Sequence, residues 1–410
     1  MKIKMNSVLE EVLQDICLSK EQEFELKKIA NEFINKLKKH NLNVGIGGSL
    51  AKNTLIKKKT QDIDIFVVFN SEKEIGRLEI ILKQLKLKLK KVHGSRDYFQ
   101  VNISPNVIIE VIPVLKIKKK QDVDNVTDFS LSHVNYIRNK IKKDSKLANQ
   151  IKLAKVFCHA QDCYGAESYI KGFSGYSLEV LVCYFGGFIN FLKNIGKEKY
   201  KIIDPEKYFK NKQQILWELN ESKLKSGLII IDPTYKYRNV CAGLSKETFE
   251  KFLKSVNNFL KFPSIKAFEK QEINFSKIKS FAKKRNAKLL KIIFKTEKQE
   301  GDIAGTKMRK FFDFICSEFE RKSQKVLQKE FVYEKGNSAT VYLIIKEKKQ
   351  IERKGPPIND VSAVYRFKKA HKTVKKKGKF LYVHEKTSIQ DVLKFLKRFE
   401  KDMNVKINII

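Results

Sequence analysis

Two aspartates interrupt an apolar run in the N-terminal part of this 410-residue chain. Asp62 and Asp64 lie in DIDIFVVF, whose apolar residues are typical of a β-strand. Strand side chains alternate between faces, so the two carboxylates point the same way, about 6–7 Å apart along the strand. Two partly buried carboxylates at that spacing repel each other unless a cation lies between them. The pattern therefore predicts a divalent metal site.

A glycine-rich turn precedes the aspartates. In GGSLAKNT, Gly47 and Gly48 are followed by Ser49, which stands thirteen residues before Asp62. Glycine lets a backbone approach a phosphate closely, and the N-terminus of a helix presents free N–H groups to it. Ser49 adds a hydroxyl and Lys52 adds a cation one turn later. Such a glycine pair alone is most often only a turn, but with two strand carboxylates at this distance it predicts a phosphate-binding site.

A third carboxylate completes the pattern. Metal-assisted phosphoryl transfer uses two Mg²⁺ ions held by carboxylates, which neutralise the phosphate, activate the attacking hydroxyl and stabilise the leaving oxygen. Glu110 is the acid within VIIEVIPV, an apolar strand that follows DIDIF in the same predicted domain. Taken alone, Glu110 would be interpreted as an edge-strand glutamate that faces water. Beside the two aspartates it is predicted to be the third metal ligand.

The elements that must position these residues follow from the apolar periodicity. Helices at residues 8–16 and 24–37 precede a short strand near NVGI, GGS turns the chain into another helix, and DIDIFVVF follows as a strand. A helix at residues 74–91 and strands at DYFQVNI and NVIIEVIPVL complete a small mixed α/β domain. From SKLANQIKLAKVFCHA to about residue 260 the pattern is mostly helical, with breaks at GFSG and DPTY. Strands such as LLKIIF and ATVYLIIK then alternate with helices, and RKGPPIND is predicted as a break.

The composition points to a polyanionic partner. Lys and Arg number 85 against 46 Asp and Glu, a formal net charge of +39, and self-repulsion on that scale is best tolerated when the partner is a polyanion such as a nucleic acid. Drift of lysine onto solvated faces in a lysine-rich proteome is the alternative explanation for part of the charge. A hydrophobic fraction of 42% excludes wholesale disorder.

The cysteines and apolar segments set the compartment that we expect. Six cysteines without paired CxxC spacing argue against a zinc site, and the length argues against a disulfide scaffold, so a reducing compartment fits. The N-terminus MKIKMNSVLEEVL carries charge where a signal peptide needs an apolar core. The most apolar stretch, SLEVLVCYFGGFINFL, contains Glu179 and Asn190 and falls short of a membrane span. We therefore expect a soluble cytoplasmic protein without a membrane partner.

These residues carry a resemblance to a known family. The segments GGSLAKNT, DIDIFVVF and IIEVIPVL resemble the signature of the polymerase-β nucleotidyltransferase superfamily. Downstream, YGAESYIKGFSGYSLEVLV and IIDPTYKYRNVCAGLSKETFEKF resemble the neck region of the archaeal (class I) CCA-adding enzymes, and RKGPPINDVSAVYRFKKAH resembles their tail region. The similarity spans residues from about 40 to 370. The superfamily signature alone does not separate tRNA from other acceptors, whereas the neck and tail segments do.

The resemblance implies a function. It implies addition of C, C and A to the 3′ end of tRNA from CTP and ATP, without a nucleic-acid template and with Mg²⁺ as cofactor. It places Asp62, Asp64 and Glu110 on the metal ions as catalytic residues. The nucleotide-binding residues that it implies are Gly48, Ser49, Lys52, His133, Lys155, Tyr164 and Arg238. These residue types suit a nucleotide: lysines neutralise phosphate charge, an aromatic ring can stack on the base, and arginine offers a planar donor fork to the base edge.

Two positions depart from the family pattern. The family usually has arginine where this chain has Lys52, which keeps the charge but loses a bidentate phosphate contact. It usually has aspartate where this chain has Glu110, whose longer side chain must fold back to reach the same ion. Both acids present oxygen to a hard cation, so the exchange is chemically tolerable.

The predicted fold class is a multidomain α/β (α+β) protein with four parts. A nucleotidyltransferase head with a mixed sheet spans residues 1–140 and a mainly helical neck spans 141–260. An α+β body spans 261–315, with 380–410 returning to it, and a tail spans 316–379. Body and tail are predicted to bind the acceptor stem, 3′ end and elbow of tRNA. The oligomeric state is left open between a monomer and a homodimer.

Two other functions share parts of this pattern. Another terminal nucleotidyltransferase, such as a poly(A) polymerase-like enzyme, would share the carboxylate site but lack selection for both CTP and ATP. A non-catalytic tRNA-binding protein could retain a relic catalytic domain. The presence of all three carboxylates and of the phosphate-binding serine argues against the relic.

Overall fold

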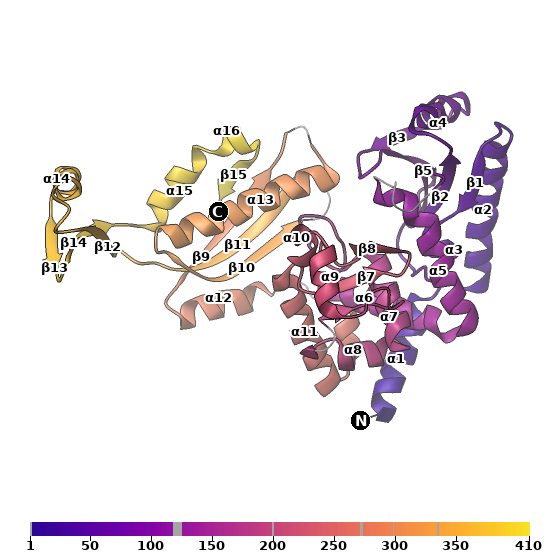
Figure 1. Cartoon of the computed structure of the whole chain (residues 1–410), viewed down its shortest axis with the longest axis horizontal. Coiled ribbons are helices and arrows are strands. Elements are labelled where there is room, and N and C mark those ends of the chain that lie inside the picture. Colours follow the sequence, from indigo (N-terminus) through magenta and orange to yellow (C-terminus); the bar gives the residue numbers. More distant parts are fainter. Residues whose placement is uncertain (1, 118–124, 199–200, 271–273, 298, 334–335) are drawn as a thin grey trace. The chain divides into compact units, whose positions relative to one another are not determined.

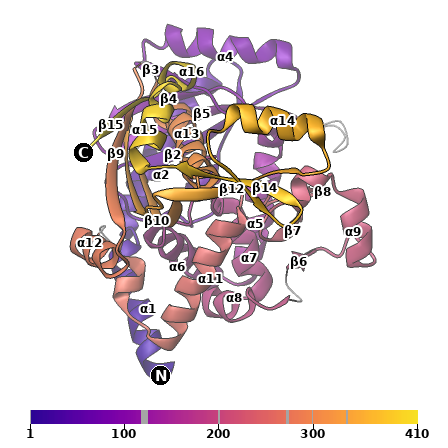
Figure 2. The ribbon, with the colours of Figure 1, turned by 90° about the vertical axis from the view of Figure 1, so that its left-hand side faces the viewer.

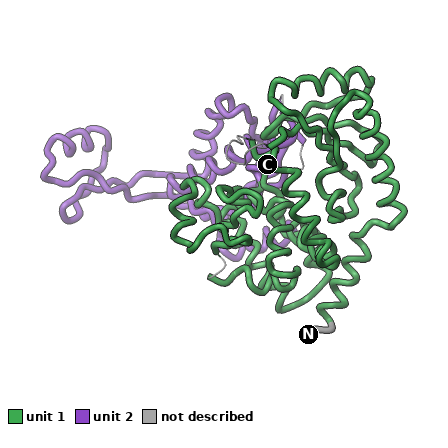
Figure 3. Tube along the Cα trace, turned by 45° about the vertical axis from the view of Figure 1, so that its right-hand side comes forward, with its two compact units in different colours: residues 1–166, 170–271 green, residues 167–169, 272–410 purple. Residues whose placement is uncertain are grey.

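The computed structural model describes residues 2–117, 125–198, 201–270, 274–297, 299–333 and 336–410. Within these residues the chain forms two compact units (Figure 3). Unit 1 comprises residues 1–166 and 170–271, and unit 2 comprises residues 167–169 and 272–410. The predicted multidomain α+β class is confirmed by the helices and sheets of both units. The four-part division stays a prediction; helix α13 runs through its proposed boundary at residue 315.

Unit 1 begins with the elements that carry the carboxylates (Figure 1). In chain order they are α1 (Lys2–Ile16), α2 (Lys20–Lys38), β1 (Asn43–Ile46), α3 (Gly48–Ala51), β2 (Gln61–Phe69), α4 (Glu72–Gln84), β3 (Leu89–Val92), β4 (Tyr98–Ser104), β5 (Val107–Leu115), η2 (Val126–Phe129) and α5 (Ser130–Lys143). The strands form one mixed sheet in the order β1-β2-β5-β4-β3, in which β2 and β5 are parallel.

The remainder of unit 1 is mainly helical. It contains α6 (Lys146–Ala160), α7 (Gly175–Phe185), α8 (Phe188–Asn194), β6 (Ile202–Ile203), α9 (Lys212–Glu218), α10 (Glu221–Leu224), β7 (Ile229–Asp232), β8 (Tyr235–Asn239), α11 (Lys246–Lys261) and η4 (Ile265–Phe268). A core rich in phenylalanine joins α6, α7, α8 and α11, and Met5, Val8 and Val12 of α1 pack into it. The first helix therefore packs in this core, although it lies within the predicted head.

Unit 2 is an α/β layer with an appended small sheet. Its elements are α12 (Phe275–Lys284), β9 (Lys288–Lys295), α13 (Gly301–Arg321), β10 (Lys325–Tyr333), β11 (Ser338–Lys346), β12 (Gln350–Pro357), α14 (Val361–Ala370), β13 (Val374–Lys377), β14 (Phe380–Lys386), α15 (Ile389–Lys397), α16 (Glu400–Met403) and β15 (Lys406–Ile409). The sheet β10-β11-β9-β15 packs α13 and α15 against Leu343 and Ile345 on one face and α12 against Ile344 on the other. Helix α14 lies along the separate sheet β12-β14-β13 (Figure 2).

One predicted helix boundary was wrong, and two predicted breaks contain more structure than expected. The helix expected at 74–91 ends at Gln84, and β3 follows. Its last residues, LKLKLKK, alternate leucine and lysine with the period of a strand. RKGPPIND is not only a break, because its two prolines belong to the edge strand β12. Proline is tolerated on an edge strand, where its missing N–H does not cost a hydrogen bond between strands. DPTY forms the β7–β8 hairpin.

The most apolar segment of unit 1 forms two helices, α7 and α8, with a sharp bend between them. Among the described residues no single helix is long and apolar enough to cross a membrane. The bent pair α7 and α8 reaches the required length and composition only when its two helices are taken together. Leu178, Val180 and Leu181 of that pair are buried in the core of unit 1.

Candidate active site

The central sheet places the three predicted metal ligands on one face. Along β2, Ile63 and Ile65 point into the core beneath α2 and α4, so Asp62 and Asp64 lie on the opposite face. Glu110 of β5 is the direct register partner of Asp64. The far end of the same face is apolar and packs against α5, which leaves the carboxylate end uncovered by that helix.

Burial makes Asp64 an unusual aspartate. The pKa of its carboxyl group is raised to about 6, chiefly by desolvation and also by the nearby carboxylate of Asp62, while the ammonium groups of Lys52 and Lys155 oppose the increase. Gly48 lies directly against this carboxylate, because a Cβ atom built at Gly48 would overlap the Asp64 side chain. The turn and the carboxylate therefore occupy adjoining space.

Glu110 and Asp62 have local partners in this structure. The side-chain amide of Gln100, on the neighbouring strand β4, donates a hydrogen bond to Oε1 of Glu110 at 2.8 Å. Lys58 lies 4.0 Å from Asp62, whose side chain is 43% exposed. Both contacts are compatible with a change of side-chain torsion, because neither carboxylate is enclosed.

The oxygen donors fit a divalent cation by type and by shared face. Carboxylates are the ligands that Mg²⁺ takes from proteins. Within the described residues, however, no three acidic, histidine or cysteine side chains converge closely enough to hold an ion. Strands β2 and β5 already bring the backbones of Asp62, Asp64 and Glu110 together. The three carboxylates can therefore converge on an ion by rotation of their side chains, without a change in strand register.

The helix that follows β1 is shorter than predicted. The helix predicted after GGS is a single turn, α3, and Gly48 at its start has φ +56°, a conformation that favours glycine. The Gly47 amide donates to the carbonyl oxygen of Asp64 at 2.8 Å, which fixes the turn to strand β2. Ser49 is half-buried, and its carbonyl oxygen accepts from the amides of Lys52 and Thr54.

Lys52 and Lys155 meet at a buried glutamate that the sequence analysis did not assign to the site. Nζ of Lys52 lies 2.6 Å from Oε2 of Glu179, and Nζ of Lys155 lies 2.9 Å from Oε1. Burial alone would raise the pKa of Glu179, but the ammonium groups of Lys155 and Lys52 lower it to about 2. A charged residue within the apolar helix SLEVLV is the signal that could have revealed this contact.

His133 and Arg238 share a second buried acid, Asp232. Nε2 of His133 lies 3.0 Å from Oδ2 of Asp232, and Nη1 of Arg238 donates to the same oxygen at 2.8 Å. Burial lowers the pKa of His133, and the adjacent Asp232 carboxylate opposes that shift. The hydroxyl of Tyr176 donates to Oδ1 of Asp232, and its ring stacks on His133 at 3.9 Å. The hairpin β7–β8 thus brings Arg238 beside a histidine 105 positions earlier.

Tyr164 lies beside the lysine cluster. Its ring stacks on His159 with 3.8 Å between centroids. A Cβ atom built at Gly175, the first residue of α7, would lie 2.9 Å from the Tyr164 hydroxyl and 3.9 Å from Cε of Lys155. Tyr164 and Lys155 therefore approach the same glycine.

The predicted residues form three groups in one electrostatic neighbourhood. The carboxylates lie on the sheet, Lys52, Lys155 and Tyr164 gather near the start of α7, and the third group is His133 with Arg238. The charge of Lys52 lowers the pKa of both Asp64 and His133. This arrangement is suited to a bound molecule with several phosphates next to a metal site.

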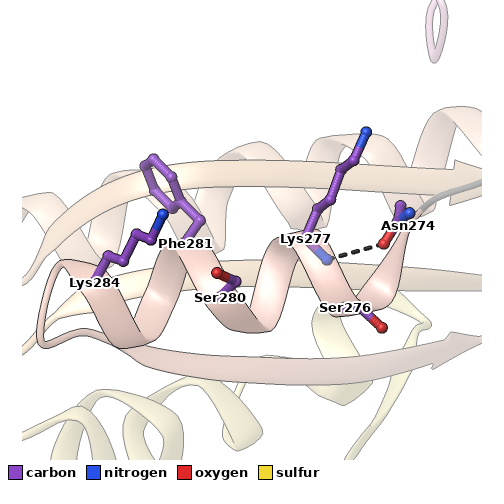
Figure 4. Close-up of a pocket in the computed structure, with 6 residues that line it drawn as sticks. All are labelled: Asn274, Ser276, Lys277, Ser280, Phe281 and Lys284. Atoms are coloured by element: carbon purple, nitrogen blue, oxygen red, sulfur yellow. Dashed lines mark hydrogen bonds between the residues drawn. The ribbon is translucent and has the colours of Figure 1, made fainter.

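Two cavities of the described chain lie apart from the carboxylates. One of about 560 Å³ in unit 1 has Lys27, Lys52, Arg138 and Lys142 in its wall and no acidic side chain. The other, of about 430 Å³, lies along α12 in unit 2, where Lys277, Phe281 and Lys284 line it (Figure 4). Lys52 is the one predicted site residue that either cavity contains.

Two family models match overlapping parts of unit 1. The model for a nucleotidyltransferase domain matches residues 26–158, and the model for the second domain of tRNA nucleotidyltransferases matches residues 149–269. Curated relatives include the CCA-adding enzyme of Nanoarchaeum equitans, which is 34% identical over 351 residues, covering 83% of this chain and 84% of that protein. The chain belongs to the CCA-adding enzyme family. The predicted enzyme class, a CCA tRNA nucleotidyltransferase, is thereby confirmed.

Other CCA-adding enzymes match the chain at lower identity or over a shorter length. The relative from Archaeoglobus fulgidus is 24% identical over 89% of this chain and 82% of its own length. The relative from Methanocaldococcus jannaschii is 32% identical over 65% of this chain and 62% of its own length. The family and superfamily resemblance predicted from the motifs is confirmed by these matches.

Solved structures support the fold. A cytoplasmic RNA terminal U-transferase covers 67% of this chain and 99% of its own, with a TM-score of 0.51 and 14% identity. A Cid1 poly(U) polymerase bound to Mg 3′-dATP covers 64% of this chain and 98% of its own, with the same TM-score and identity. At such identity the likeness establishes a nucleotidyltransferase fold. Nucleotidyltransferases use divalent metal ions, which agrees with the oxygen donors on the sheet.

Proposed function

We propose that this member of the family adds C, C and A to the 3′ end of tRNA from CTP and ATP, without a nucleic-acid template. One observation supports this most strongly: the aspartate pair on β2 and Glu110 on β5 share a sheet face beside Gly48 and the Lys52–Lys155 cluster. A nucleotidyl donor needs acidic metal ligands and cations for its phosphates side by side.

The carboxylates and the cations have separate roles in this proposal. Asp62, Asp64 and Glu110 would hold two Mg²⁺ ions, which would neutralise phosphate charge and increase the acidity of the attacking hydroxyl. The 3′-oxygen of tRNA forms a bond to the α-phosphorus, the bond from that phosphorus to the β-phosphate oxygen breaks, and pyrophosphate leaves. Glu110 accepts the hydroxyl proton.

The remaining residues bind the nucleotide. The triphosphate is contacted by the backbone at Gly48, the Ser49 hydroxyl and the Lys52 ammonium. Lys155 adds a second positive charge next to Lys52, on the other oxygen of Glu179. Tyr164 and His133 flank the nucleotide. Arg238, held by Asp232, presents its guanidinium fork to the base edge.

The acceptor is proposed to be bound by shape and charge. A-form RNA hides base identity in its deep major groove, so contacts to the backbone of the acceptor stem and elbow do not depend on sequence. The net charge of +39 supports such contacts. The enzyme is proposed to act in the cytoplasm, where tRNA is matured and repaired. It is proposed to be a monomer or a homodimer, and light scattering would distinguish the two.

An addition assay tests the function. The protein is incubated with Mg²⁺ and tRNA that lacks its terminal CCA, first with CTP alone, then ATP alone, then both. We expect two additions from CTP alone, none from ATP alone, and three from the mixture, after which the reaction stops. Continued addition of one nucleotide would identify another terminal nucleotidyltransferase, and no addition would leave a tRNA-binding protein.

A further inference from the structure

Helix α7 buries one carboxylate in the middle of an apolar segment. The side chain of Glu179 has no solvent exposure, and its neighbours Leu178, Val180 and Leu181 belong to the core. A buried carboxylate is costly unless it is paired and hydrogen-bonded, and here both of its oxygens have partners. Lys52 contacts Oε2, while Lys155 and the Thr54 hydroxyl contact Oε1.

The contacts connect two matched regions of the sequence. Lys52 and Thr54 lie in the connection between β1 and β2, which belongs to the matched nucleotidyltransferase domain. Glu179 lies on α7, within the matched second domain of tRNA nucleotidyltransferases. The carboxylate therefore sets the position of a lysine that a different part of the chain supplies.

The two lysines differ in their remaining hydrogen-bonding capacity. An ammonium group has three N–H donors. Lys155 has three acceptors within reach: Oε1 of Glu179 at 2.9 Å, the Thr54 hydroxyl at 3.0 Å and the Thr54 carbonyl at 3.3 Å. Within the part of the chain that the structure describes, the Lys52 ammonium has one hydrogen bond, to Glu179. Lys52 thus retains two donors for a ligand, and it also lines the acid-free cavity of unit 1.

Charge balance explains why a glutamate is needed here. Two ammonium groups on the same carboxylate repel each other, and burial alone already lowers the pKa of Lys155. The ionised Glu179 lies between the two ammonium groups and offsets their repulsion, and the group of three carries a net charge of +1. Without the carboxylate, the two ammonium groups would repel each other and Lys52 would lose the partner that holds it in place.

We propose that Glu179 is a positioning residue for nucleotide binding, which holds the Lys52 ammonium where it meets the phosphates of the incoming nucleotide. Lys155 is the buried counter-cation that fixes the carboxylate. The inference rests on the proposed function, since it requires Lys52 to contact the triphosphate. It makes Lys52 the direct phosphate ligand of the pair and Lys155 a supporting residue.

The test is a double-mutant cycle on Glu179 and Lys52. Glu179→Gln keeps the shape but offers one acceptor for two ammonium groups. We expect it to raise the KM for CTP and for ATP about tenfold or more, with kcat changed less than about threefold. Lys52→Met should raise KM at least as much. If Glu179 acts through Lys52, the double variant matches Lys52→Met alone within about twofold.

Controls separate positioning from folding. Glu32→Gln, at an exposed position of α2, should leave KM unchanged. The dissociation constant for tRNA and the melting temperature are measured for each variant, because a merely structural role would alter these and kcat as well. If Glu179→Gln does not fold, Thr54→Val loosens the same carboxylate, and its KM increase of about twofold or more should vanish in the Lys52→Met background.

The outcomes distinguish this inference from the proposed function. If Lys52→Met raises KM and the Glu179→Gln effect multiplies in full on top of it, the positioning role is wrong while the nucleotide-binding role of Lys52 stands. If Lys52→Met retains the wild-type KM, Lys52 is no phosphate ligand, and the positioning role falls with that assignment. The ordered addition of C, C and A tests the function itself independently of both.

Discussion

At the scale of single residues, two carboxylates of unit 1, the half-buried Asp64 and the buried Glu179, have opposite electrostatic environments. The pKa of Asp64 is raised to about 6, chiefly by burial, whereas the cations around Glu179 lower its pKa to about 2. The paired Glu179 stabilises the fold when it is ionised. Asp64 destabilises the metal-free protein at neutral pH, which is the behaviour expected of a group kept for catalysis.

Asp64→Asn should therefore stabilise the metal-free protein and abolish nucleotide addition. A raised carboxyl pKa is a penalty that is absent below about pH 4 and complete above about pH 6, amounting to on the order of 2–3 kcal/mol at pH 7. Denaturant unfolding in EDTA should show the variant more stable than wild type at pH 7 and nearly equal to it at pH 4. Addition rates should fall about a thousandfold or more. A less stable variant at pH 7 would contradict the electrostatic account.

The proposed role of Glu110 as metal ligand and proton acceptor is tested by replacing it with aspartate and with glutamine. Glu110→Asp restores the residue usual in the family and should keep substantial activity, although it withdraws the carboxylate from Gln100. Glu110→Gln keeps the shape without the charge and should lose about a hundredfold or more in rate with little change in nucleotide affinity. Single-turnover addition of CMP measures both. If the glutamine variant matches wild type, Glu110 is structural and the third metal ligand lies elsewhere.

At the scale of elements, the site depends on how closely α3 approaches strand β2. The turn is held by the Gly47 amide on the Asp64 carbonyl, and Gly48 touches the Asp64 side chain. The approach is available only to glycine, because of both the positive φ of Gly48 and the space occupied by the carboxylate. The backbone proposed to bind phosphate and the carboxylate proposed to bind metal are thereby held close together.

Gly48→Ala should thus displace the turn and the Asp64 carboxylate together. We expect addition to fall about a hundredfold or more, with the melting temperature of the protein lowered by a few degrees from about 1–2 kcal/mol of strain. Gly45→Ala is the matched control, because a Cβ at this position on β1 meets no atom within 4 Å. It should retain wild-type rates. Equal activity of the two variants would show that the close approach is unimportant.

At the scale of the whole molecule, charge is distributed over both units. The three consecutive lysines Lys375 to Lys377 lie exposed along β13, and Tyr365 of α14 is 68% exposed in the same small subdomain. Aromatic rings and lysines together suit an RNA surface. The predicted tail therefore carries features of an RNA-contacting surface.

Binding of tRNA should weaken steeply with salt and vary little among tRNA species. Each phosphate contact that is lost lowers the slope of log affinity against log salt by about 0.7–0.9. Lys375→Gln with Lys376→Gln should reduce the slope by about 1–2 units. Lys246→Gln with Lys254→Gln, at exposed positions of α11 outside the predicted body and tail, is the matched control. A flat salt response, or a strong preference for one tRNA sequence, would contradict binding by backbone and shape.

The sequence by itself determined which sheet face the candidate carboxylates share, because the relevant signals are local. Alternation along DIDIFVVF places Asp62 and Asp64 on one face, and the neighbouring apolar strand supplies Glu110. The glycines before Ser49 likewise predicted a turn that the structure contains, although the helix after it is one turn long. Family membership follows from motifs that are each continuous in the chain.

Only the tertiary structure decided how the cations are held. Glu179 lies 127 positions after Lys52, and Asp232 lies 99 positions after His133. No periodicity links residues at such separations, because their pairing depends on how α7 and the β7–β8 hairpin pack within unit 1. In the sequence, Glu179 is only a charge that interrupts an apolar helix. Folding turns that interruption into the partner of two lysines, since a buried carboxylate must find cations where water is excluded.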